Sequence, residues 1–453
     1  MNILIVCYCY APDPGPRAYR WSAIAEYWAA RGHHVDVISG WKIGAARFER
    51  LNGVNVYRVS GAVTENLRFW IERCARERSR PEERLSPQAL GGARFSGPAG
   101  ALKRLHDLTW KKVYWPDSAC LWFFPAWGRA KRLMAETPYD AVISTSTPYT
   151  GHLVGQRIKK RHPEVHWLVD IGDPFSFYYD APWNNVALFD RLNRRSETKV
   201  LERADSVSVT VASCLAAYET HFPGVKRKTR VIPPVLASSV TAGEGPTEQR
   251  SSRAKRLVFA GTLYRNIRNP AYLLRLYAHL LDRRADLELH FFGRINDCAD
   301  VFEPYAALLD KRIFLHGLVS HNHAVAAVAS AHVLVNIGNT TAYQLPSKIV
   351  EYVSAAKPIL NIVRGDADCS LAFLDGYPAT LSVTESAGGP DEAEIARVLN
   401  FICSPPELPK GFLEAFLEPY RADAVAQRYL ELIAGDAGEA DPSTVRAKPL
   451  QVT

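Results

Sequence analysis

The stretch GNTTAYQLPSKIVEYVSAAKPILNIV, Gly338 to Val363, combines a polar loop, a helix start and a buried strand in one run. Pro346 is typical of a first helical position, and the apolar residues after it recur at helical spacing. Lys357-Pro358 ends the helix, and the apolar run that follows predicts a parallel strand. Because this helix follows the carboxyl end of a strand, its backbone N–H groups and its dipole could hold a phosphate.

Two charged side chains share another face of the same helix. Lys348 would add positive charge beside the helix N-terminus, and Glu351, one turn later, could accept hydrogen bonds from sugar or ribose hydroxyls. The same residues also fit an ordinary amphipathic helix that carries a solvated Lys/Glu pair. Taken alone, this stretch leaves both interpretations open.

The length of 453 residues indicates two domains, because a single hydrophobic core rarely grows beyond about 250–300 residues. The eight cysteines are scattered, without a Cys-x-x-Cys pair or zinc-finger spacing, which argues against a disulfide framework and a structural metal. No basic signal region precedes the first apolar run, and no apolar run approaches the ~20 residues that cross a bilayer. We therefore expect a cytoplasmic protein.

One segment, residues 68–132, holds 14 Lys/Arg against 6 Asp/Glu, an excess that equals the net charge of +8 of the whole chain. Aromatic residues are interleaved with these charges, and the mixture suits an anionic membrane surface or an acidic lipid-linked ligand. Nucleic acid is a weaker candidate, because no recognition-helix, zinc-finger or RNA-binding signature accompanies the charge. A solvated insertion whose aromatic residues fold inward fits equally well. The aromatic residues are Phe69, Trp70, Trp110, Tyr114, Trp115, Trp122, Phe123, Phe124 and Trp127.

Strands and helices alternate along both halves of the chain, which predicts an α/β fold with mostly parallel sheets. The first turn of the chain is not Gly-x-Gly-x-x-Gly, so a nicotinamide enzyme loses support. The predicted strands of the first half are 2–8, 35–39, 54–60, 140–144, 166–171, 206–210 and 230–232. Those of the second half are 257–260, 287–292, 313–316, 333–337 and 358–363.

These patterns predict two Rossmann-like domains that face a central cleft. The N-terminal domain covers residues 1–235 and is interrupted by the basic and aromatic insertion at about 62–135. A linker at 236–254, rich in Ser, Thr and Gly, leads to the C-terminal domain at 255–410. A last amphipathic helix at 411–434 and a polar tail at 435–453 follow.

A series of motifs runs from end to end of the chain: YAPDPGPRAYRWSAIAEYWAARGHHVDVIS, ISTSTPYTGHLVGQRIKKRHPEVHWLVDIGDPF, ERADSVSVTVAS, RVIPP, LVFAGTLYRNIRNP, LHFFGRI, FLHGLVS and PSKIVEYVSAAKPIL, with WPDSACLWFFPAW at the end of the insertion. As an ordered set they resemble bacterial family 4 glycosyltransferases of the GT-B fold, especially those of surface-polysaccharide assembly. The resemblance covers most of the chain outside the insertion, the linker and the tail.

The resemblance implies that the C-terminal half binds a nucleotide-diphospho-sugar, a UDP- or GDP-sugar, as co-substrate without a further cofactor. Arg265 and Lys348 are the catalytic candidates, because a cation offsets the charge that grows on the leaving diphosphate. Glu351 matches the glutamate of the family that binds ribose hydroxyls. The donor-binding candidates are Gly15, Gly261, Gly293, Arg294, Gly317, Leu318, Ser347 and Glu351.

The N-terminal half supplies candidates for the reacting end of the donor and for the acceptor. His152 matches a histidine that often touches the donor sugar, and Asp173 could bind the acceptor or act as a base. Arg17 or Arg20 could contact phosphate or acceptor, and Asp117 is a further acceptor-binding candidate. Each also fits a structural role: a surface cation, a core histidine or a helix N-cap.

Two departures from the family's pattern and one apparent motif bear on the chemistry. Tyr343 stands where many relatives carry a first glutamate, and Gly172 stands where many carry the arginine of Arg-Asp-Pro-Trp. Asp366-Ala367-Asp368 looks like a metal-binding Asp-x-Asp, but the implied fold needs no metal for the diphosphate, so we expect no metal site.

The resemblance implies a glycosyltransferase that moves a sugar, with retention, onto a lipid-linked or polysaccharide acceptor at the inner face of the plasma membrane. Two alternatives stay open: a sugar-nucleotide epimerase of the same fold, and a non-catalytic subunit of a polysaccharide-assembly complex. The second is motivated by Tyr343 and Gly172.

Overall fold

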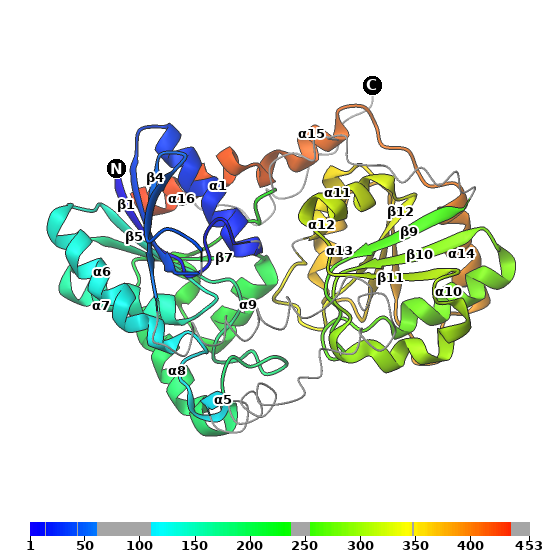
Figure 1. Ribbon diagram of the computed structural model, residues 1–453, viewed down its shortest axis with the longest axis horizontal. Helices are drawn as coiled ribbons and strands as arrows, with labels where there is room; N and C mark the ends of the chain where they lie inside the picture. The colour runs from blue at the N-terminus through cyan, green and yellow to red at the C-terminus, as the bar shows by residue number, and fades with distance from the viewer. Residues whose placement is uncertain (14, 43, 61–109, 237–253, 347, 436–453) are drawn as a thin grey trace. The chain divides into compact units, whose positions relative to one another are not determined.

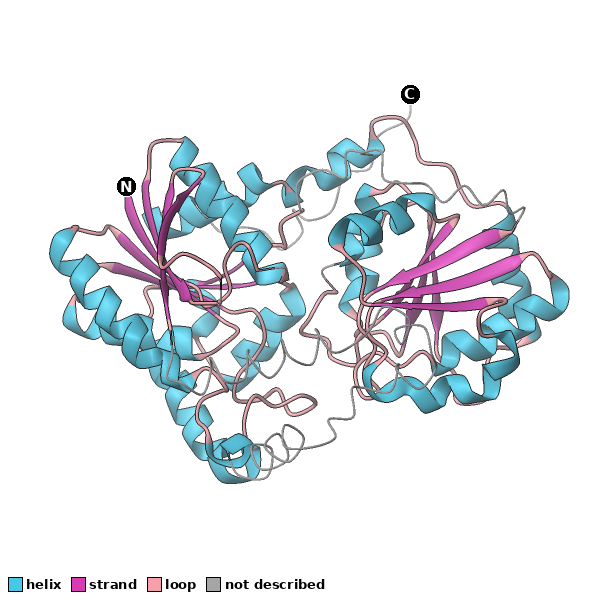
Figure 2. Cartoon of the chain, viewed as in Figure 1, coloured by secondary structure: helices cyan, strands magenta, loops and turns pink. Residues whose placement is uncertain are grey.

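The computed structural model describes residues 1–435 except 14, 43, 61–109, 237–253 and 347. The described chain divides into two compact units. The N-terminal unit contains residues 1–60, 110–236 and 419–435, and the C-terminal unit contains residues 254–418. Each unit is a sheet covered by helices on both faces (Figures 1 and 2).

The sheet of the N-terminal unit has the strand order β3-β4-β2-β1-β5-β6-β7-β8. All neighbours are parallel except the edge pair β3 and β4, which is antiparallel. The strands are β1 (Asn2–Val6), β2 (His34–Gly40), β3 (Phe48–Leu51), β4 (Val54–Val59), β5 (Ala141–Thr145), β6 (His166–Asp170), β7 (Ser206–Val209) and β8 (Thr229–Val231).

Helix α1 opens with Pro16, whose missing N–H costs nothing at that position, and the chain leaves it at Gly32 with φ of 83°. Its buried Trp21 and Trp28 pack together with Tyr429 of α16 on one face of the sheet. The helices of this unit are α1 (Pro16–Ala30), α5 (Trp110–Val113), α6 (Phe123–Glu136), α7 (Thr150–Arg161), α8 (Val186–Arg203), α9 (Ala212–His221) and α16 (Ala422–Ala434), with 3-10 turns η2 (Cys120–Trp122) and η3 (Val225–Lys228).

The sheet of the C-terminal unit is parallel throughout, in the order β11-β10-β9-β12-β13-β14. Alternate residues of β10, such as Leu287, Leu289 and Phe291, enter the main core, and the others face the opposite side. The strands are β9 (Lys255–Ala260), β10 (Leu287–Phe292), β11 (Ile313–Gly317), β12 (Val333–Ile337), β13 (Ile359–Val363) and β14 (Thr380–Thr384).

Helix α14 is capped by Asp391, whose carboxylate accepts the Glu394 N–H (2.7 Å). It packs with α10 against the main core of the C-terminal unit. The helices of this unit are α10 (Ala271–Arg283), α11 (His321–Ser330), α12 (Lys348–Ser354), α13 (Cys369–Leu374), α14 (Glu392–Cys403) and α15 (Phe412–Leu417), with the 3-10 segment η4 (Asn296–Leu308).

Every strand predicted from the sequence is present within two residues of its expected position, and β3 and β14 were not predicted. The segment 411–434, expected as one helix, is instead α15 and α16 separated by the 3-10 turn η5 (Glu418–Tyr420). The end of the expected insertion is the regular helix α6 (Phe123–Glu136), which contacts α7 and buries Ala126, Ala130 and Leu133. Residues 61–109 lie outside the described part of the chain.

Candidate functional site

Four loops meet at the carboxyl edge of the C-terminal sheet, where the sequence places the donor site. The Gly293 N–H donates to the Gly317 carbonyl (2.8 Å), so the loops after β10 and β11 are joined. The Leu263 N–H donates to the Arg294 carbonyl (2.8 Å), which adds the loop after β9. The Thr340 N–H donates to the Ile267 carbonyl (3.0 Å), which adds the loop before α12. The predicted donor-binding segments of this unit therefore lie side by side.

Residue 293 must be a glycine because its backbone lies directly against Gly261. Its φ is 130°, and a Cβ at this position would lie 1.9 Å from the Gly261 carbonyl oxygen. Gly317 has φ of 66°, but a Cβ there would meet nothing within 4 Å. Both glycines let the chain turn sharply at the end of a strand. Only at Gly293 is there also no room for a side chain.

Helix α12 carries the charged pair that was predicted from the sequence. The Lys348 ammonium lies 2.5 Å from the Glu351 carboxylate, and the two side chains are 33% and 18% exposed. Tyr352 ties the helix to the end of β9, because its hydroxyl accepts the Ala260 N–H (2.6 Å). Lys348 and Glu351 are thus held on a fixed helix while staying open to solvent. Ser347 lies outside the described residues.

The other donor-site candidates differ in what they contact. Arg265 donates to the Asp297 carbonyl (2.8 Å) and pairs with Asp300, so a diphosphate would compete with that ion pair. Leu318 is 68% exposed and Arg294 is also exposed. Tyr343 lies half-buried on the loop before α12.

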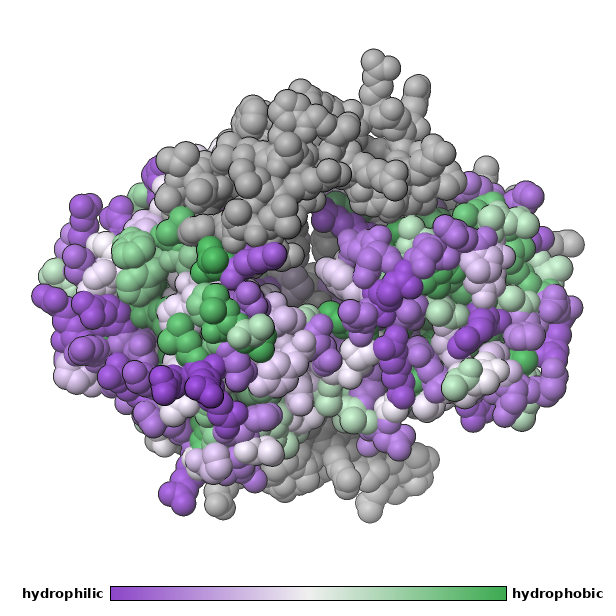
Figure 3. All heavy atoms as spheres, turned by 90° about the horizontal axis from the view of Figure 1, so that it is seen from below, coloured by the Kyte–Doolittle hydropathy of each residue, from purple (hydrophilic) through white to green (hydrophobic). Residues whose placement is uncertain are grey.

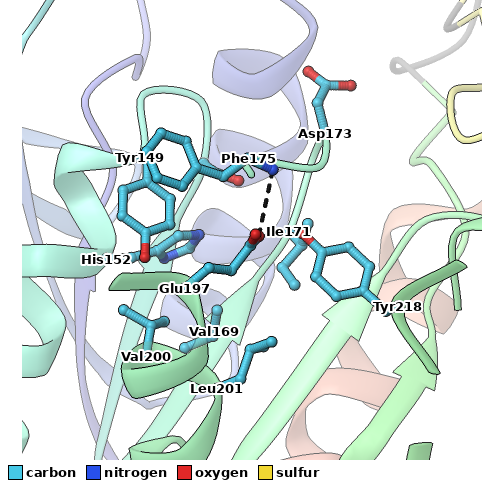
Figure 4. Close-up of a pocket in the computed structure, with 11 residues that line it drawn as sticks. Tyr149, His152, Val169, Ile171, Asp173, Phe175, Glu197, Val200, Leu201 and Tyr218 are labelled. Atoms are coloured by element: carbon cyan, nitrogen blue, oxygen red, sulfur yellow. Dashed lines mark hydrogen bonds between the residues drawn. The ribbon is translucent and has the colours of Figure 1, made fainter. Parts of the chain in front are cut away.

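In the N-terminal unit, His152 and Asp173 line one small cavity. Its volume is about 10 Å³, the lower limit for a single water molecule, so it holds no substrate in this state. Figure 4 shows the Asp173 carboxylate directed away from the Glu197 carboxylate, and Asp173 is partly exposed. The cavity is lined by Ser146, Tyr149, His152, Val169, Ile171, Asp173, Phe175, Glu197, Val200, Leu201 and Tyr218.

His152 is a buried, neutral histidine. The Trp167 indole donates to the Ser144 hydroxyl (2.9 Å), and this hydroxyl lies 2.9 Å from Nδ1 of His152. If the hydroxyl donates a hydrogen bond to Nδ1, the ring hydrogen is on Nε2, and among the described residues Nε2 has no partner. Burial lowers the pKa of His152 to about 3, so the ring is uncharged at neutral pH.

Glu197 was not singled out from the sequence, yet it fixes the loop that carries Asp173. Its carboxylate accepts the Ser176 N–H (2.9 Å), the Phe175 N–H (3.3 Å) and the Tyr218 hydroxyl (2.7 Å). Burial raises the pKa of Glu197, and these hydrogen bonds oppose that effect. Only its helical position, with Ser196 and Val200 on the buried side of α8, could have marked it in the sequence.

Asp170, the last residue of β6, is the second group that the sequence did not reveal. One carboxylate oxygen accepts from Arg17 (2.6 Å) and the Trp21 indole (3.1 Å), and the other accepts from Ser208 (2.8 Å) and Tyr429 (2.6 Å). Burial by itself would raise the pKa of Asp170, but the charges of Arg17 and Arg20 and these hydrogen bonds outweigh it and lower the pKa.

Gly172 makes room for Arg17. A Cβ at residue 172 would lie 1.7 Å from Nη2 of Arg17, so the guanidinium occupies the volume of a side chain at this position. Gly15 precedes α1 at its N-cap and would meet nothing with an added Cβ. The predicted donor contact of Gly15 stays a prediction.

The two acceptor-binding candidates are engaged in holding the unit together. Arg20 is 5% exposed and donates to the Pro233 carbonyl (2.5 Å), the Ile232 carbonyl (3.1 Å) and the Tyr429 hydroxyl (2.7 Å). Asp117 is 3% exposed and accepts from the N–H and the hydroxyl of Thr150 at the start of α7 (2.8 and 2.9 Å). Both are better explained as structural residues than as acceptor contacts.

Asp366 and Asp368 differ in environment. Asp366 is exposed, whereas Asp368 is buried and accepts the Ser370 N–H (2.8 Å) at the start of α13. Within the described residues, no group of His, Cys, Asp and Glu has an arrangement that could hold a metal ion. No helix in the described ranges combines the length and the apolar character that a membrane crossing needs.

Solved structures with the same architecture cover nearly the whole chain. Anabaena HepE in complex with UDP and glucose is 12% identical, with a TM-score of 0.59 over 96% of this chain and 99% of that one. A glycosyltransferase from Rickettsia africae is 10% identical, with a TM-score of 0.57 over 96% and 98%. A Listeria monocytogenes protein assigned as a UDP-N-acetylglucosamine 2-epimerase is 10% identical, with a TM-score of 0.51 over 97% and 98%.

The chain has the GT-B fold. This confirms the fold class predicted from the alternation of strands and helices. No protein-family model matches the sequence, and no curated protein matches it. At 10–12% identity the likeness concerns the GT-B fold alone, so the chemistry must be argued from this chain's own residues.

Proposed function

We propose that this protein is a glycosyltransferase that moves a sugar from a nucleotide-diphosphate donor to a hydroxyl of a lipid-linked or polysaccharide acceptor. The observation that carries the proposal is the carboxyl edge of the C-terminal sheet, where four loops converge beside the partly exposed pair Lys348 and Glu351. The GT-B fold supports it, since HepE, of the same fold, was solved with UDP and glucose.

Lys348 would offset the charge that develops on the nucleoside diphosphate as the glycosidic bond breaks. Glu351 accepts hydrogen bonds, as the ribose hydroxyls of the donor require, and its pairing with Lys348 keeps both side chains in place. Arg265 can join them after giving up Asp300. With two cations at the diphosphate we expect turnover to persist in a metal chelator.

On the N-terminal side, the neutral His152 could donate a hydrogen bond through Nε2 to a sugar hydroxyl, and Asp173 lies at the cavity rim where it can meet an acceptor. The cavity must widen for either contact. Retention of configuration follows from the family resemblance, and the stereochemistry of the product tests it.

A second candidate is a sugar-nucleotide epimerase, supported by the Listeria structure of the same fold. The deciding experiment incubates the protein with a panel of nucleotide sugars, with and without a lipid extract as acceptor. Nucleoside diphosphate released only with acceptor supports the transferase. Isomerised nucleotide sugar without acceptor supports the epimerase, and binding without any turnover supports a non-catalytic subunit.

We also propose that the protein binds the inner face of the plasma membrane peripherally. The N-terminal unit exposes Val113 of α5 and Leu188 and Leu192 of α8, with Arg191 and Arg195 exposed on the same helix. These elements adjoin, because Asn185 donates to the Lys112 carbonyl (3.3 Å). Figure 3 shows hydrophobic side chains gathered on one face of this unit among hydrophilic ones. Anionic vesicles should sediment the protein at low salt, and neutral vesicles should not.

A further inference from the structure

Three side chains on the outer strands of the C-terminal sheet form a hydrogen-bonded row. The Glu288 carboxylate lies 3.2 Å from Nε2 of His290, and Nδ1 of His290 lies 3.0 Å from Nε2 of His316. The row begins at the guanidinium of Arg256, whose Nε lies 3.6 Å from the Glu288 carboxylate. It ends at His316, the last residue of β11 before Gly317.

The donors and acceptors in this row fix the positions of the ring hydrogens. A carboxylate only accepts, so Nε2 of His290 carries a hydrogen. Burial lowers the pKa of His290, so the ring is neutral and its Nδ1 accepts. Nε2 of His316 must then donate. In a neutral His316 this leaves Nδ1 as a bare acceptor.

Stacked rings hold the two histidines in place. Phe314 stacks on His290 with ring centroids 4.6 Å apart, and Phe292 stacks on His316 at 4.0 Å and 2°. Phe292 and His316 are the side chains just before Gly293 and Gly317, which are joined by a hydrogen bond at the candidate donor site. His316 is exposed, and no described residue is recorded as a partner of its Nδ1. An oriented acceptor is therefore presented to solvent at this edge.

We propose that Nδ1 of His316 selects the nucleobase of the donor by accepting a hydrogen bond from a ring N–H, with its tautomer set by Glu288 through His290. This rests on the proposed function, because it places the base of the nucleotide sugar at the ends of β10 and β11. Uracil and guanine carry a ring N–H on their pairing edge. Cytosine and adenine present a lone pair there, which would face the lone pair of Nδ1.

The selected substrates are thus uridine- or guanosine-diphosphate sugars, and cytidine and adenosine nucleotides are rejected. A buried or oriented hydrogen-bonding group discriminates by leaving itself unpaired with the wrong ligand. We expect UDP or GDP to bind at least about tenfold more tightly than CDP or ADP.

The tautomer is tested without any ligand. Long-range ¹⁵N–¹H correlation spectra of ¹⁵N-histidine-labelled protein at neutral pH should show His316 protonated at Nε2 only. In Glu288→Gln the side-chain amide can donate to His290 as well as accept from it. The hydrogen bonds along the row can then run in either direction, so both His316 tautomers should be populated. Nδ1-protonated His316 in the unchanged protein would overturn the inference, whatever the protein binds.

The selectivity is tested by calorimetry with UDP, GDP, CDP and ADP. His316→Phe keeps a ring on Phe292 but removes the acceptor, so the affinity ratio of UDP to CDP should fall by about tenfold toward equality. Glu288→Gln should lower the ratio less, and His279→Phe, an exposed histidine on α10, should leave it unchanged. An unaltered ratio in His316→Phe would refute the inference while nucleotide binding continued to support the proposed function. Failure of all four nucleotides to bind the unchanged protein would refute both.

Discussion

The polar clusters of the two units are built differently. In the N-terminal unit, two buried carboxylates collect hydrogen bonds: Asp170, at the end of β6, receives four from side chains, and Glu197 of α8 receives three, two of them from backbone N–H groups. In the C-terminal unit, the loops are bound through their backbone, and the side chains of Lys348 and His316 remain open. The first arrangement stabilises a fold, and the second leaves groups available to a ligand.

Under the proposed function, the C-terminal edge is ready to bind the donor, whereas the N-terminal cavity must change before it can bind an acceptor. The cavity with His152 and Asp173 holds about one water molecule. Substitutions in the N-terminal cluster should therefore reduce stability first, and substitutions at the C-terminal edge should reduce activity first.

The largest expected effect is the loss of folding stability in the Asp170→Asn variant. The change removes the buried charge that compensates the partly buried Arg17 guanidinium, and breaking a buried pair costs about 3–5 kcal/mol. Denaturant unfolding followed by tryptophan fluorescence should report this loss. The exposed Asp180→Asn in the same unit should stay within about 0.5 kcal/mol of the unchanged protein. Equal stabilities for the two variants would show that the Asp170 network does not hold the unit together.

The next largest effect is expected on the rate of sugar transfer, in variants of the C-terminal unit. Lys348→Ala and Glu351→Gln should each lower the rate of sugar transfer by about a hundredfold or more, as expected when a group that stabilises developing charge is removed. Because both side chains are partly exposed, the melting temperature should change little. Lys311→Ala, an exposed lysine at the amino edge of the same sheet, is the matched control. Full activity in both variants would remove this pair from the site.

The candidate residues of the C-terminal unit match local features of the structure better than those of the N-terminal unit, for a physical reason. Gly293, Gly317 and Lys348 act through local geometry, a turn at a strand end or the first turn of a helix, and local geometry leaves a local pattern. The predicted functional residues of that unit therefore lie together in the structure.

Asp170 and Arg20 act through contacts between residues far apart in the chain. Tyr429 approaches Asp170 across more than two hundred residues, and no pattern around Arg20 indicates that it binds the carbonyls of Ile232 and Pro233. Such partners depend on how the α16 helix docks, so Arg20 was predicted to bind an acceptor and is found inside the unit.

The glycines of the C-terminal edge allow a smaller, paired test. Gly293→Ala adds a Cβ against the Gly261 carbonyl in addition to backbone strain, which together cost about 2–4 kcal/mol, and the joined loops should lose nucleotide affinity. Gly317→Ala carries only the strain of a positive φ, about 1–2 kcal/mol. If the two variants lose equal stability, close packing of the loops does not shape the site.

The last prediction concerns the pH dependence of stability that His152 alone contributes, which stays below about 1 kcal/mol within half a pH unit of pH 6.5. Burial lowers the pKa of His152 to about 3 in the folded protein, whereas the unfolded chain has a pKa near 6.5, so between these values the unfolded state binds the extra proton. The free energy of unfolding should therefore fall as the pH is lowered from about 6.5, by up to about 1.4 kcal/mol per pH unit. His152→Gln removes this titration, and subtracting its unfolding curve from that of the unchanged protein cancels the other ionisable groups. A difference that does not vary between pH 6.5 and pH 4 would mean that His152 can be protonated in the folded state, and the N-terminal cavity would then be as open as the C-terminal edge.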